Sequence, residues 1–171
     1  MIDRMLINWM KAFVAFVLTL IVLGFCITSF RCAYADELKQ CEQYRERVEV
    51  ILKSEAVSID YYYLMVAESR CTEKAVSEKG AAGFWQLMPG TLKHYGCDDA
   101  FDLECSTRAA ARYLRHLHSV FGTFDDVIIA YNMGGHNYKR NGATKQAKGL
   151  LFKVNSLKAR SNNGRESEGC E

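Results

Sequence analysis

Residues 61–90, which read YYYLMVAESRCTEKAVSEKGAAGFWQLMPG, decide the fold. The opening stretch, Tyr61–Arg70, is rich in aromatic and aliphatic side chains and predicts a buried helix, with Ser58 or Asp60 as its cap. The stretch Glu73–Gly90 contains glycines and the one proline of the chain, so it predicts a loop or a small hairpin. This segment therefore predicts one buried helix with a glycine-rich loop beside it.

Further helices are expected on both sides of this segment. Apolar residues spaced three and four apart indicate amphipathic helices at 37–55, 107–121 and 143–158. Ser106 is expected to cap the second of these, and Thr123 to open another helix with acids in its first turn. With 171 residues, 49% of them hydrophobic, the chain is long enough for one domain rather than two. The expected fold class is mainly α.

The amino end carries a separate signal. Residues 12–30, AFVAFVLTLIVLGFCITSF, contain no charge, and Arg31 and the small residues Ala33 and Ala35 follow. This order predicts a secretory signal peptide cleaved after Ala35, while the run is also long enough for a retained inner-membrane anchor. Both alternatives export the rest of the chain to the periplasm. The expected parts are a signal or anchor at 1–35, a domain at 36–158 and a disordered polar tail at 159–171.

Charge is unevenly distributed along the chain. Residues 127–165 contain eight Lys or Arg and no acid, although the whole chain is nearly balanced, with 22 basic and 20 acidic residues. Such a stretch can bind an anionic polymer, a membrane surface or a protein partner, or it can be a solvated helix face. Nucleic acid is not expected as a partner, because an exported protein seldom meets it.

Five cysteines follow the signal segment, and an odd number in an exported protein favours two disulfides and one free thiol. Cys97 and Cys105 flank a short loop and are expected to pair. Cys41 and Cys71 lie at similar distances from the turn between two predicted helices, so an antiparallel helix pair would join them. Cys170 then stays free in the tail. The spacing is not that of a zinc site, so no metal is expected. No cofactor is expected either.

Glu68 is the first candidate for chemistry. On its helix it shares a face with Leu64 and Met65, so partial burial is expected to raise the pKa of its carboxyl. The helix dipole acts in the same direction, because it disfavours negative charge near the carboxyl end of a helix. A carboxyl that is protonated at neutral pH suits general-acid cleavage of a glycosidic bond. Taken alone, a Glu at the end of an apolar helix is more often a solvated residue.

Two further segments carry side chains that suit a sugar. In the glycine-rich loop, Gln86 offers an amide donor and acceptor, and Phe84, Trp85 and Met88 offer apolar surface. The other segment, AYNMG at 130–134, ends a helix with a phenol and an amide. Each segment alone can equally serve packing and capping.

Together and in this order, ESRCTEKAVS, GAAGFWQLMPGT and AYNMG resemble the three signature segments of the lytic murein transglycosylases with a lysozyme-like (SLT) domain. The AAGFWQLMP form, followed by STRAAARYL, is most similar to the membrane-bound lytic murein transglycosylase D branch. The resemblance covers about 60–135 and implies a lysozyme-like single domain. It also implies that Glu68 is the catalytic acid and base. The substrate-contacting positions that it implies are Ser77, Gln86, Met88, Tyr131 and Asn132.

The activity implied by this resemblance is cleavage of peptidoglycan between N-acetylmuramic acid and N-acetylglucosamine without water. Glu68 would protonate the leaving oxygen and then, as a carboxylate, take the proton of the C6 hydroxyl, which closes a 1,6-anhydro ring. Tyr131 would hold Glu68 by a hydrogen bond. Peptidoglycan strands are the expected partner, either in general wall turnover or in local opening of the wall for a secretion or conjugation machine.

Two alternatives stay open from the sequence. One is a hydrolytic muramidase, in which Glu73 or Glu78 orients a water as the second carboxylate. The other is a non-catalytic module that binds peptidoglycan during assembly of a machine. No second carboxylate is singled out, since Asp125 and Asp126 are explained by the start of a helix.

Overall fold

The computed structural model describes residues 2–167, with side chains described at 9–11, 13–21 and 37–162. By its internal packing the chain divides into two compact units, Met1–Asp36 and Glu37–Glu171.

The first unit is the opening part of α1 (Ile2–Ser54), and the uncharged run at 12–30 is helical throughout. In the part of the chain that the structure describes, no helix is both long enough and apolar enough to cross a membrane. The expected signal-peptidase site at Ala33–Ala35 lies outside the described side chains.

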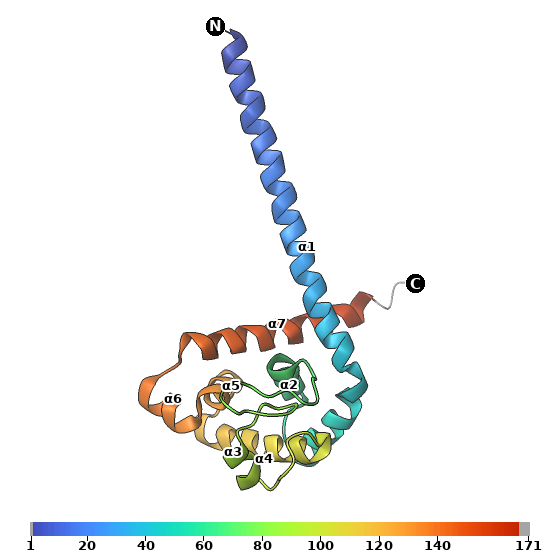
Figure 1. Cartoon of the computed structure of the whole chain (residues 1–171), viewed down its shortest axis with the longest axis vertical. Helices are drawn as coiled ribbons and strands as arrows, with labels where there is room; N and C mark the ends of the chain where they lie inside the picture. The colour runs from blue at the N-terminus through green and yellow to red at the C-terminus, as the bar shows by residue number, and fades with distance from the viewer. Residues whose placement is uncertain (1, 168–171) are drawn as a thin grey trace. The chain divides into compact units, whose positions relative to one another are not determined.

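The second unit is built from helices, and within residues 37–167 the extended pairing is limited to isolated bridges. The mainly α class expected from the sequence is therefore confirmed. After α1 the elements are the 3-10 helix η1 (Ile59–Tyr61), α2 (Tyr62–Ser69), α3 (Pro89–His94), α4 (Leu103–Phe121), α5 (Phe124–Met133), α6 (Gly135–Asn141) and α7 (Lys145–Ser167) (Figure 1).

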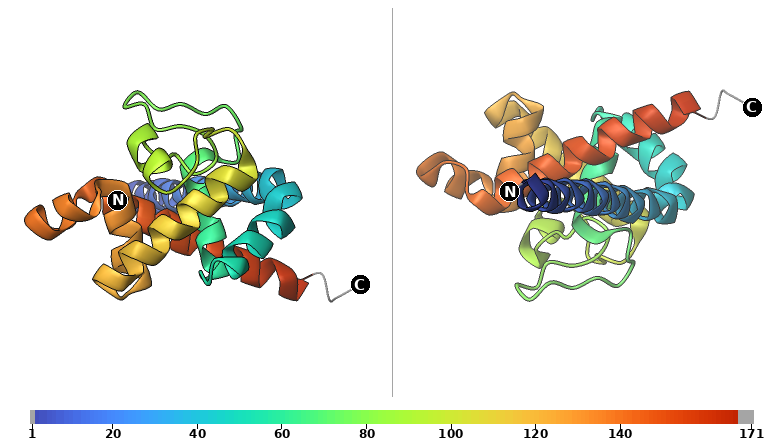
Figure 2. Two further views of the ribbon diagram at one scale, coloured as in Figure 1. Left: turned by 90° about the horizontal axis from the view of Figure 1, so that it is seen from below. Right: turned by 90° about the horizontal axis from the view of Figure 1, so that it is seen from above.

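The helix α2 forms the centre of this unit. Seven of its eight residues are buried, and the remaining residue is Glu68, which is half-buried. α7 packs against α2 and α5. Figure 2 shows α7 and the loop at 70–88 on opposite sides of the unit. The candidate acid therefore belongs to the most enclosed helix of the domain.

Several helix boundaries differ from the sequence prediction, and α6 was not predicted; two of the differences have a clear cause. α4 begins at Leu103, because the carboxylate of Asp102 accepts a hydrogen bond from the Cys105 amide and caps the helix. Ser106, the expected cap, is buried inside the first turn, where its hydroxyl donates to the carbonyl oxygen of Asp102.

The second difference concerns the carboxyl end, where α7 continues past Lys158 to Ser167. A disordered tail was expected from residue 159 onward. The helix is continued because its side chains find partners, as when Nη1 of Arg45 donates to Oγ of Ser161. Cys170, expected to be a free thiol, lies outside the described residues.

The loop at 70–88 is held by close backbone packing rather than by regular strands. Isolated antiparallel bridges join Val76 to Ala82 and Ala82 to Leu87. Gly83 has a φ of +71°, and a Cβ atom there would lie 1.8 Å from the carbonyl oxygen of Ala100. Only glycine fits this position without moving the backbone.

Two disulfides close the loops, in the two pairings that the sequence predicts. Cys41 of α1 pairs with Cys71, directly beyond the end of α2, with a Cα–Cα distance of 5.4 Å. Cys97 pairs with Cys105 of α4, with a Cα–Cα distance of 5.5 Å. The first bridge ties α1 to the end of the helix that carries Glu68.

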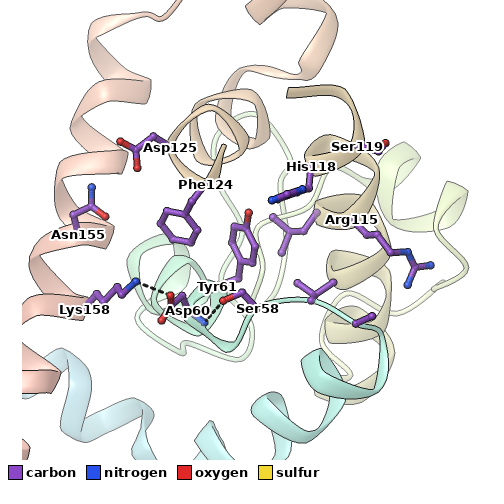
Figure 3. Close-up of a pocket in the computed structure, with 13 residues that line it drawn as sticks. Ser58, Asp60, Tyr61, Arg115, His118, Ser119, Phe124, Asp125, Asn155 and Lys158 are labelled. Carbon is purple, nitrogen blue, oxygen red and sulfur yellow. Dashed lines mark hydrogen bonds and ion pairs between the residues drawn. The ribbon is translucent and has the colours of Figure 1, made fainter. Parts of the chain in front are cut away.

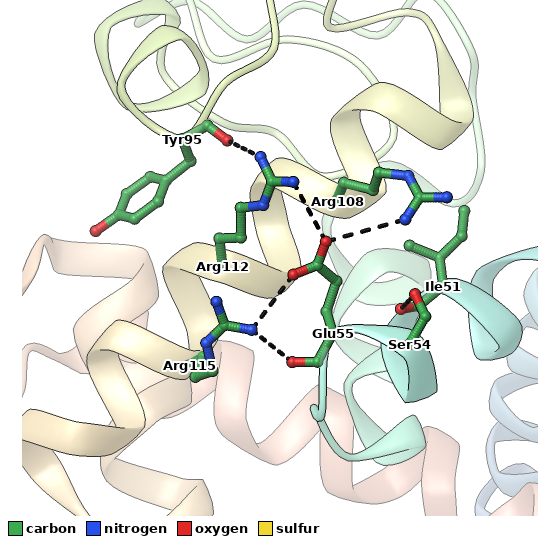
Figure 4. Close-up of polar contacts among 7 residues, drawn as sticks. All are labelled: Ile51, Ser54, Glu55, Tyr95, Arg108, Arg112 and Arg115. Atoms are coloured by element: carbon green, nitrogen blue, oxygen red, sulfur yellow. Dashed lines mark hydrogen bonds and ion pairs between the residues drawn. The ribbon is translucent and has the colours of Figure 1, made fainter.

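A cluster of charged side chains joins the end of α1 to α4 (Figure 4). The side chain of Glu55, which is 13% exposed, accepts contacts from Arg108, Arg112 and Arg115 at 3.3–3.9 Å. Nη1 of Arg115 also donates to the backbone oxygen of Glu55 at 2.7 Å. These contacts fix the chain where it turns from α1 towards η1.

Candidate active site

A cleft of about 630 Å³ lies beside the end of α2. It brings together all six residues that the sequence predicts: Glu68, Ser77, Gln86, Met88, Tyr131 and Asn132. The other lining residues are Glu78, Lys79, Ala81, Leu87, Thr91, Tyr113, Met133, Gly134 and Gln146. The lining thus comes from α2, the loop, α3, α4, α5 and α7.

Glu68 is the group in this cleft with the chemistry of an acid at neutral pH. Burial raises the pKa of its carboxyl from 4.5 to about 7, and the nearby Lys153 ammonium opposes part of that effect. A carboxyl with a pKa near 7 is present both as an acid and as a carboxylate at neutral pH. It can therefore donate a proton and later accept one.

Tyr131 binds a different partner from the one expected. Its hydroxyl donates to the backbone oxygen of Trp85 at 2.7 Å. Because that bond uses the only phenol proton, Tyr131 can face Glu68 only as an acceptor. Burial first, and then the charge of Glu68, raise the pKa of Tyr131 well above its usual value, so the phenol stays neutral.

Gln86 also differs from its expected role. Its side-chain nitrogen donates to the carbonyl oxygens of Ala75 at 3.1 Å and Gly83 at 2.9 Å. Both amide hydrogens are therefore used to shape the loop, and only the amide oxygen is left for a ligand. The residue adopts a φ of +47°, which these two bonds hold in place.

The remaining loop residues divide between the cleft and the core. Met88 is 46% exposed and offers apolar surface to the cleft, as expected. Oγ of Ser77 accepts from the Ala81 amide at 3.0 Å, which leaves its hydroxyl proton for a ligand. Phe84 and Trp85 were expected to face a sugar, but both are buried and belong to the core.

The aromatic pair of Phe84 and Trp85 is buried because each ring has a partner inside the domain. Nε1 of Trp85 donates to Oγ1 of Thr107 at 2.9 Å, and Phe84 packs edge-on against Tyr44 at 5.1 Å. These contacts hold the loop against α4 and α1.

Tyr113 lines the cleft and was missed by the sequence reasoning. The ring lies between Tyr95 at 5.2 Å and Tyr131 at 5.3 Å, and burial raises the pKa of Tyr113 to about 12. Its spacing along α4 matches that of core residues, so the pattern gave no signal that it reaches the cleft. Gln146 was missed as well, because a single polar residue at a helix start looks like ordinary surface.

The acidic residues near the signature segments are mostly engaged elsewhere. Glu73 accepts from the hydroxyl of Tyr44 at 2.9 Å, and Asp126 accepts from Thr123 at 2.6 Å. Glu78 is the second acid among the described lining residues of the cleft. Among the described residues, no group of three His, Cys, Asp or Glu side chains is arranged to hold a metal ion.

A second cavity of about 610 Å³ lies apart from the predicted site, between η1, α4, α5 and α7 (Figure 3). The buried hydroxyl of Tyr61 has no hydrogen-bond partner there, and its ring stacks on Phe124 at 4.8 Å. The nearby Lys158 ammonium binds Asp60 at 2.5 Å. None of the six predicted site residues lines this cavity.

Much of the chain, including the residues that line this cleft, is similar to known proteins. The family described as transglycosylase SLT domain matches residues 52–150. The chain is 28% identical over 121 residues to the membrane-bound lytic murein transglycosylase D of Escherichia coli strain K12, which covers 67% of this chain and 27% of that protein. It is 34% identical over 87 residues to the transglycosylase of Enterobacteria phage PRD1, which covers 50% of this chain and 32% of that protein. The matches thus span about a quarter to a third of these relatives.

Proposed function

The chain belongs to the transglycosylase SLT domain family, and we propose that it cleaves peptidoglycan between N-acetylmuramic acid and N-acetylglucosamine without adding water. One observation carries this proposal. Glu68 is a half-buried carboxyl with a pKa near 7 that opens into the cleft formed by the three signature segments. Both protonation states of such a group are available at neutral pH, and the reaction uses each of them in turn.

The first step is general-acid catalysis by Glu68. Its carboxyl gives a proton to the oxygen that links the two sugars, and the bond from that oxygen to C1 of N-acetylmuramic acid breaks. The acetamido group of the same sugar stabilises the positive charge that develops at C1. The burial that raises the pKa of Glu68 keeps this proton available.

The second step uses the same residue as a base. The Glu68 carboxylate takes the proton of the C6 hydroxyl, and the C6 oxygen bonds to C1 to form the 1,6-anhydro ring. Glu68 thereby recovers its proton. Because the nucleophile belongs to the sugar itself, no water and no second carboxylate need to be placed.

The surrounding residues bind and orient the sugars. Met88 offers an apolar surface, while the Ser77 hydroxyl and the Gln86 amide oxygen offer one donor and one acceptor. Asn132 adds an amide beside them. The Tyr131 hydroxyl holds the loop in place by donating to the backbone oxygen of Trp85. It can therefore only accept a hydrogen bond from Glu68.

Hydrolysis is the second candidate, and one observation favours it. Glu78 lies in the lining of the same cleft as Glu68, so a pair of carboxylates is available. A hydrolytic mechanism would need the second carboxylate to activate a water on the far face of the sugar or to attack C1 directly. Glu78 lies on the loop and is exposed. Replacing Glu78 therefore tests whether the reaction needs a second carboxylate.

Digestion of purified sacculi, followed by mass spectrometry of the products, tests both candidates. The transglycosylase proposal expects products lighter by one water, loss of all products in Glu68→Gln, and unchanged products in Glu78→Gln. Products with reducing ends that disappear in Glu78→Gln would instead establish hydrolysis. An intact sacculus with bound wild-type protein would reduce the domain to a binding module.

We also propose that the domain acts in the periplasm. The uncharged run at 12–30 and the small residues at Ala33 and Ala35 support export. Determining the amino-terminal residue of the protein from membrane and periplasmic fractions distinguishes cleavage after Ala35 from a retained anchor. Deletion of the gene followed by assays of wall turnover and of secretion or conjugation distinguishes a general role from a dedicated machine.

A further inference from the structure

Lys153 of α7 reaches the carboxyl end of the helix that carries Glu68. Its Nζ donates to the carbonyl oxygen of Ala67 at 3.0 Å, and Ala67 is the residue immediately before Glu68. The same Nζ lies 3.3 Å from Oε2 of Glu37 in α1. One ammonium group therefore joins α1, α2 and α7 at the point where α2 ends.

Glu37 is a buried carboxylate held between two cations. Its side chain is 10% exposed, and Oε1 lies 2.8 Å from Nε of Arg70, while Lys153 contacts the other carboxylate oxygen. The three side chains together carry a net charge of +1. A buried charge is costly unless it is paired, so Glu37 holds Lys153 in place while the cluster keeps one positive charge in excess.

This excess charge lies where the reaction changes the charge of Glu68. The carbonyl oxygens at the end of α2 disfavour a carboxylate there, and Lys153 binds one of them. Lys153 also lowers the pKa of Glu68 against the burial that raises it. Burial therefore favours the acid of the first step, and Lys153 favours the carboxylate of the second.

The other titratable groups in the cleft lining lie on other elements. They are Tyr131 from α5, Tyr113 from α4, and Glu78 and Lys79 from the loop. Burial raises the pKa of both phenols, so they stay neutral, and the two loop residues have opposite signs. Lys153 and Glu37 lie outside the lining, so they can be changed without altering the surface that contacts a sugar.

We propose that Lys153, held by Glu37, is a positioning residue for Glu68, which keeps the end of α2 in place and stabilises the Glu68 carboxylate after the first proton transfer. This inference rests on the proposed function, because it requires Glu68 to act first as an acid and then as a base. A neutral side chain of similar size can fill the same space but cannot favour the carboxylate.

Two variants of the full-length protein in detergent micelles test the proposal, because they are expected to act in opposite directions. Lys153→Met removes the positive charge and should raise the titration midpoint of Glu68 by about half a pH unit or more. Glu37→Gln leaves Lys153 and Arg70 without their counterion and should lower it by a similar amount. The midpoint is read by NMR of 13C-labelled glutamate, with the Glu68 signal assigned from its loss in Glu68→Gln.

Sacculus cleavage gives a second readout. The fall of activity at alkaline pH should move upward in Lys153→Met and downward in Glu37→Gln. Lys148→Met is the matched control, because Lys148 is an exposed lysine on the same helix, and it should move neither the titration nor the pH profile. Lys153→Arg keeps the charge and should stay close to the wild-type midpoint.

Shifts of the same sign in the two variants, or shifts no larger than in Lys148→Met, would overturn the proposal. If Lys153→Met does not fold, Glu37→Gln decides alone, because an unchanged or raised midpoint contradicts the expected direction. The titration needs no turnover. An active protein with unshifted titrations therefore overturns this inference alone, whereas a wild-type protein that cleaves nothing overturns the proposed function.

Discussion

The helices α2 and α6 are almost equal in length, with eight and seven residues, but they differ completely in burial. Seven residues of α2 are buried and none of α6 is. α2 is enclosed and has one side chain, Glu68, that reaches the cleft, whereas α6 carries Lys139 and Arg140 in its last turn. An enclosed helix can alter the pKa of its one carboxyl group. An exposed helix leaves its charges solvated.

Glu68→Gln is expected to have the largest effect of any substitution in the two helices. The amide keeps the shape of the side chain but cannot donate the proton, so sacculus cleavage should fall by about 1,000-fold or more. Arg140→Gln in α6 is the control and should keep cleavage within about three-fold, since it removes a solvated charge. Substantial cleavage by a folded Glu68→Gln protein would remove Glu68 from the mechanism.

The core of α2 is expected to tolerate truncation poorly. Leu64→Ala removes a fully buried side chain and should lower the free energy of unfolding by about 2–5 kcal/mol. Asn141→Ala, at the exposed end of α6, should change it by less than about 0.5 kcal/mol. Urea denaturation of both variants measures the two losses, and equal losses would contradict the greater burial of Leu64.

The raised pKa of Glu68 also predicts how stability depends on pH. Below pH 4.5 the carboxyl is protonated in both the folded and unfolded states, and above about pH 7 it is ionised in both. Between these values the folded state binds more protons, so rising pH weakens the wild-type protein. Glu68→Gln should therefore be more stable than wild type by about 1–3 kcal/mol at pH 8, and the difference should vanish at pH 4. Thermal unfolding at the two pH values measures it, and a constant difference would contradict the burial of the charge.

Two tyrosines give the smallest and most closely matched contrast. Tyr131→Phe leaves the buried oxygen of Trp85 without its donor and should cost about 1–3 kcal/mol of folding free energy. Tyr138→Phe in α6 removes a part-buried bond to the side chain of Asp126 and should cost less than about 1 kcal/mol. Thermal unfolding ranks the two. Cleavage per folded molecule should fall in Tyr131→Phe only, because that hydroxyl holds the loop that lines the cleft.

The sequence predicted the elements whose signals are local. The apolar run at 61–70, the glycines of the loop and the cap at Thr123 each carry a pattern that spans only a few residues. The cysteine pairs could also be predicted from the sequence. The expected turn between two helices placed Cys41 beside Cys71, and Cys97 and Cys105 flank a short loop. The six cleft residues came from the resemblance, which supplied a spatial grouping that spacing alone does not contain.

The sequence could not predict contacts that depend on the exact path of the backbone. Gln86 uses both amide hydrogens inside the loop only because its φ is +47° and two carbonyl oxygens face it. Tyr113 has the spacing of a core residue and reaches the cleft because α4 ends up beside α5. The contact between Lys153 and Ala67 joins residues that are far apart in the chain, and a lysine on an amphipathic helix gives no sign of it.

The Cys41–Cys71 disulfide also determines how this domain would bear a mechanical load. If the amino-terminal segment is held in a membrane while the domain grips the wall, tension enters at Glu37 and reaches Cys41 within about one helical turn. The covalent bond then passes the tension to Cys71, across a sequence separation of 30 residues. The intervening chain, which contains α2 and Glu68, is shielded from stretching and keeps about 100 Å of contour length out of the path of the force. A tethered domain built in this way can be pulled without unwinding the helix that carries Glu68.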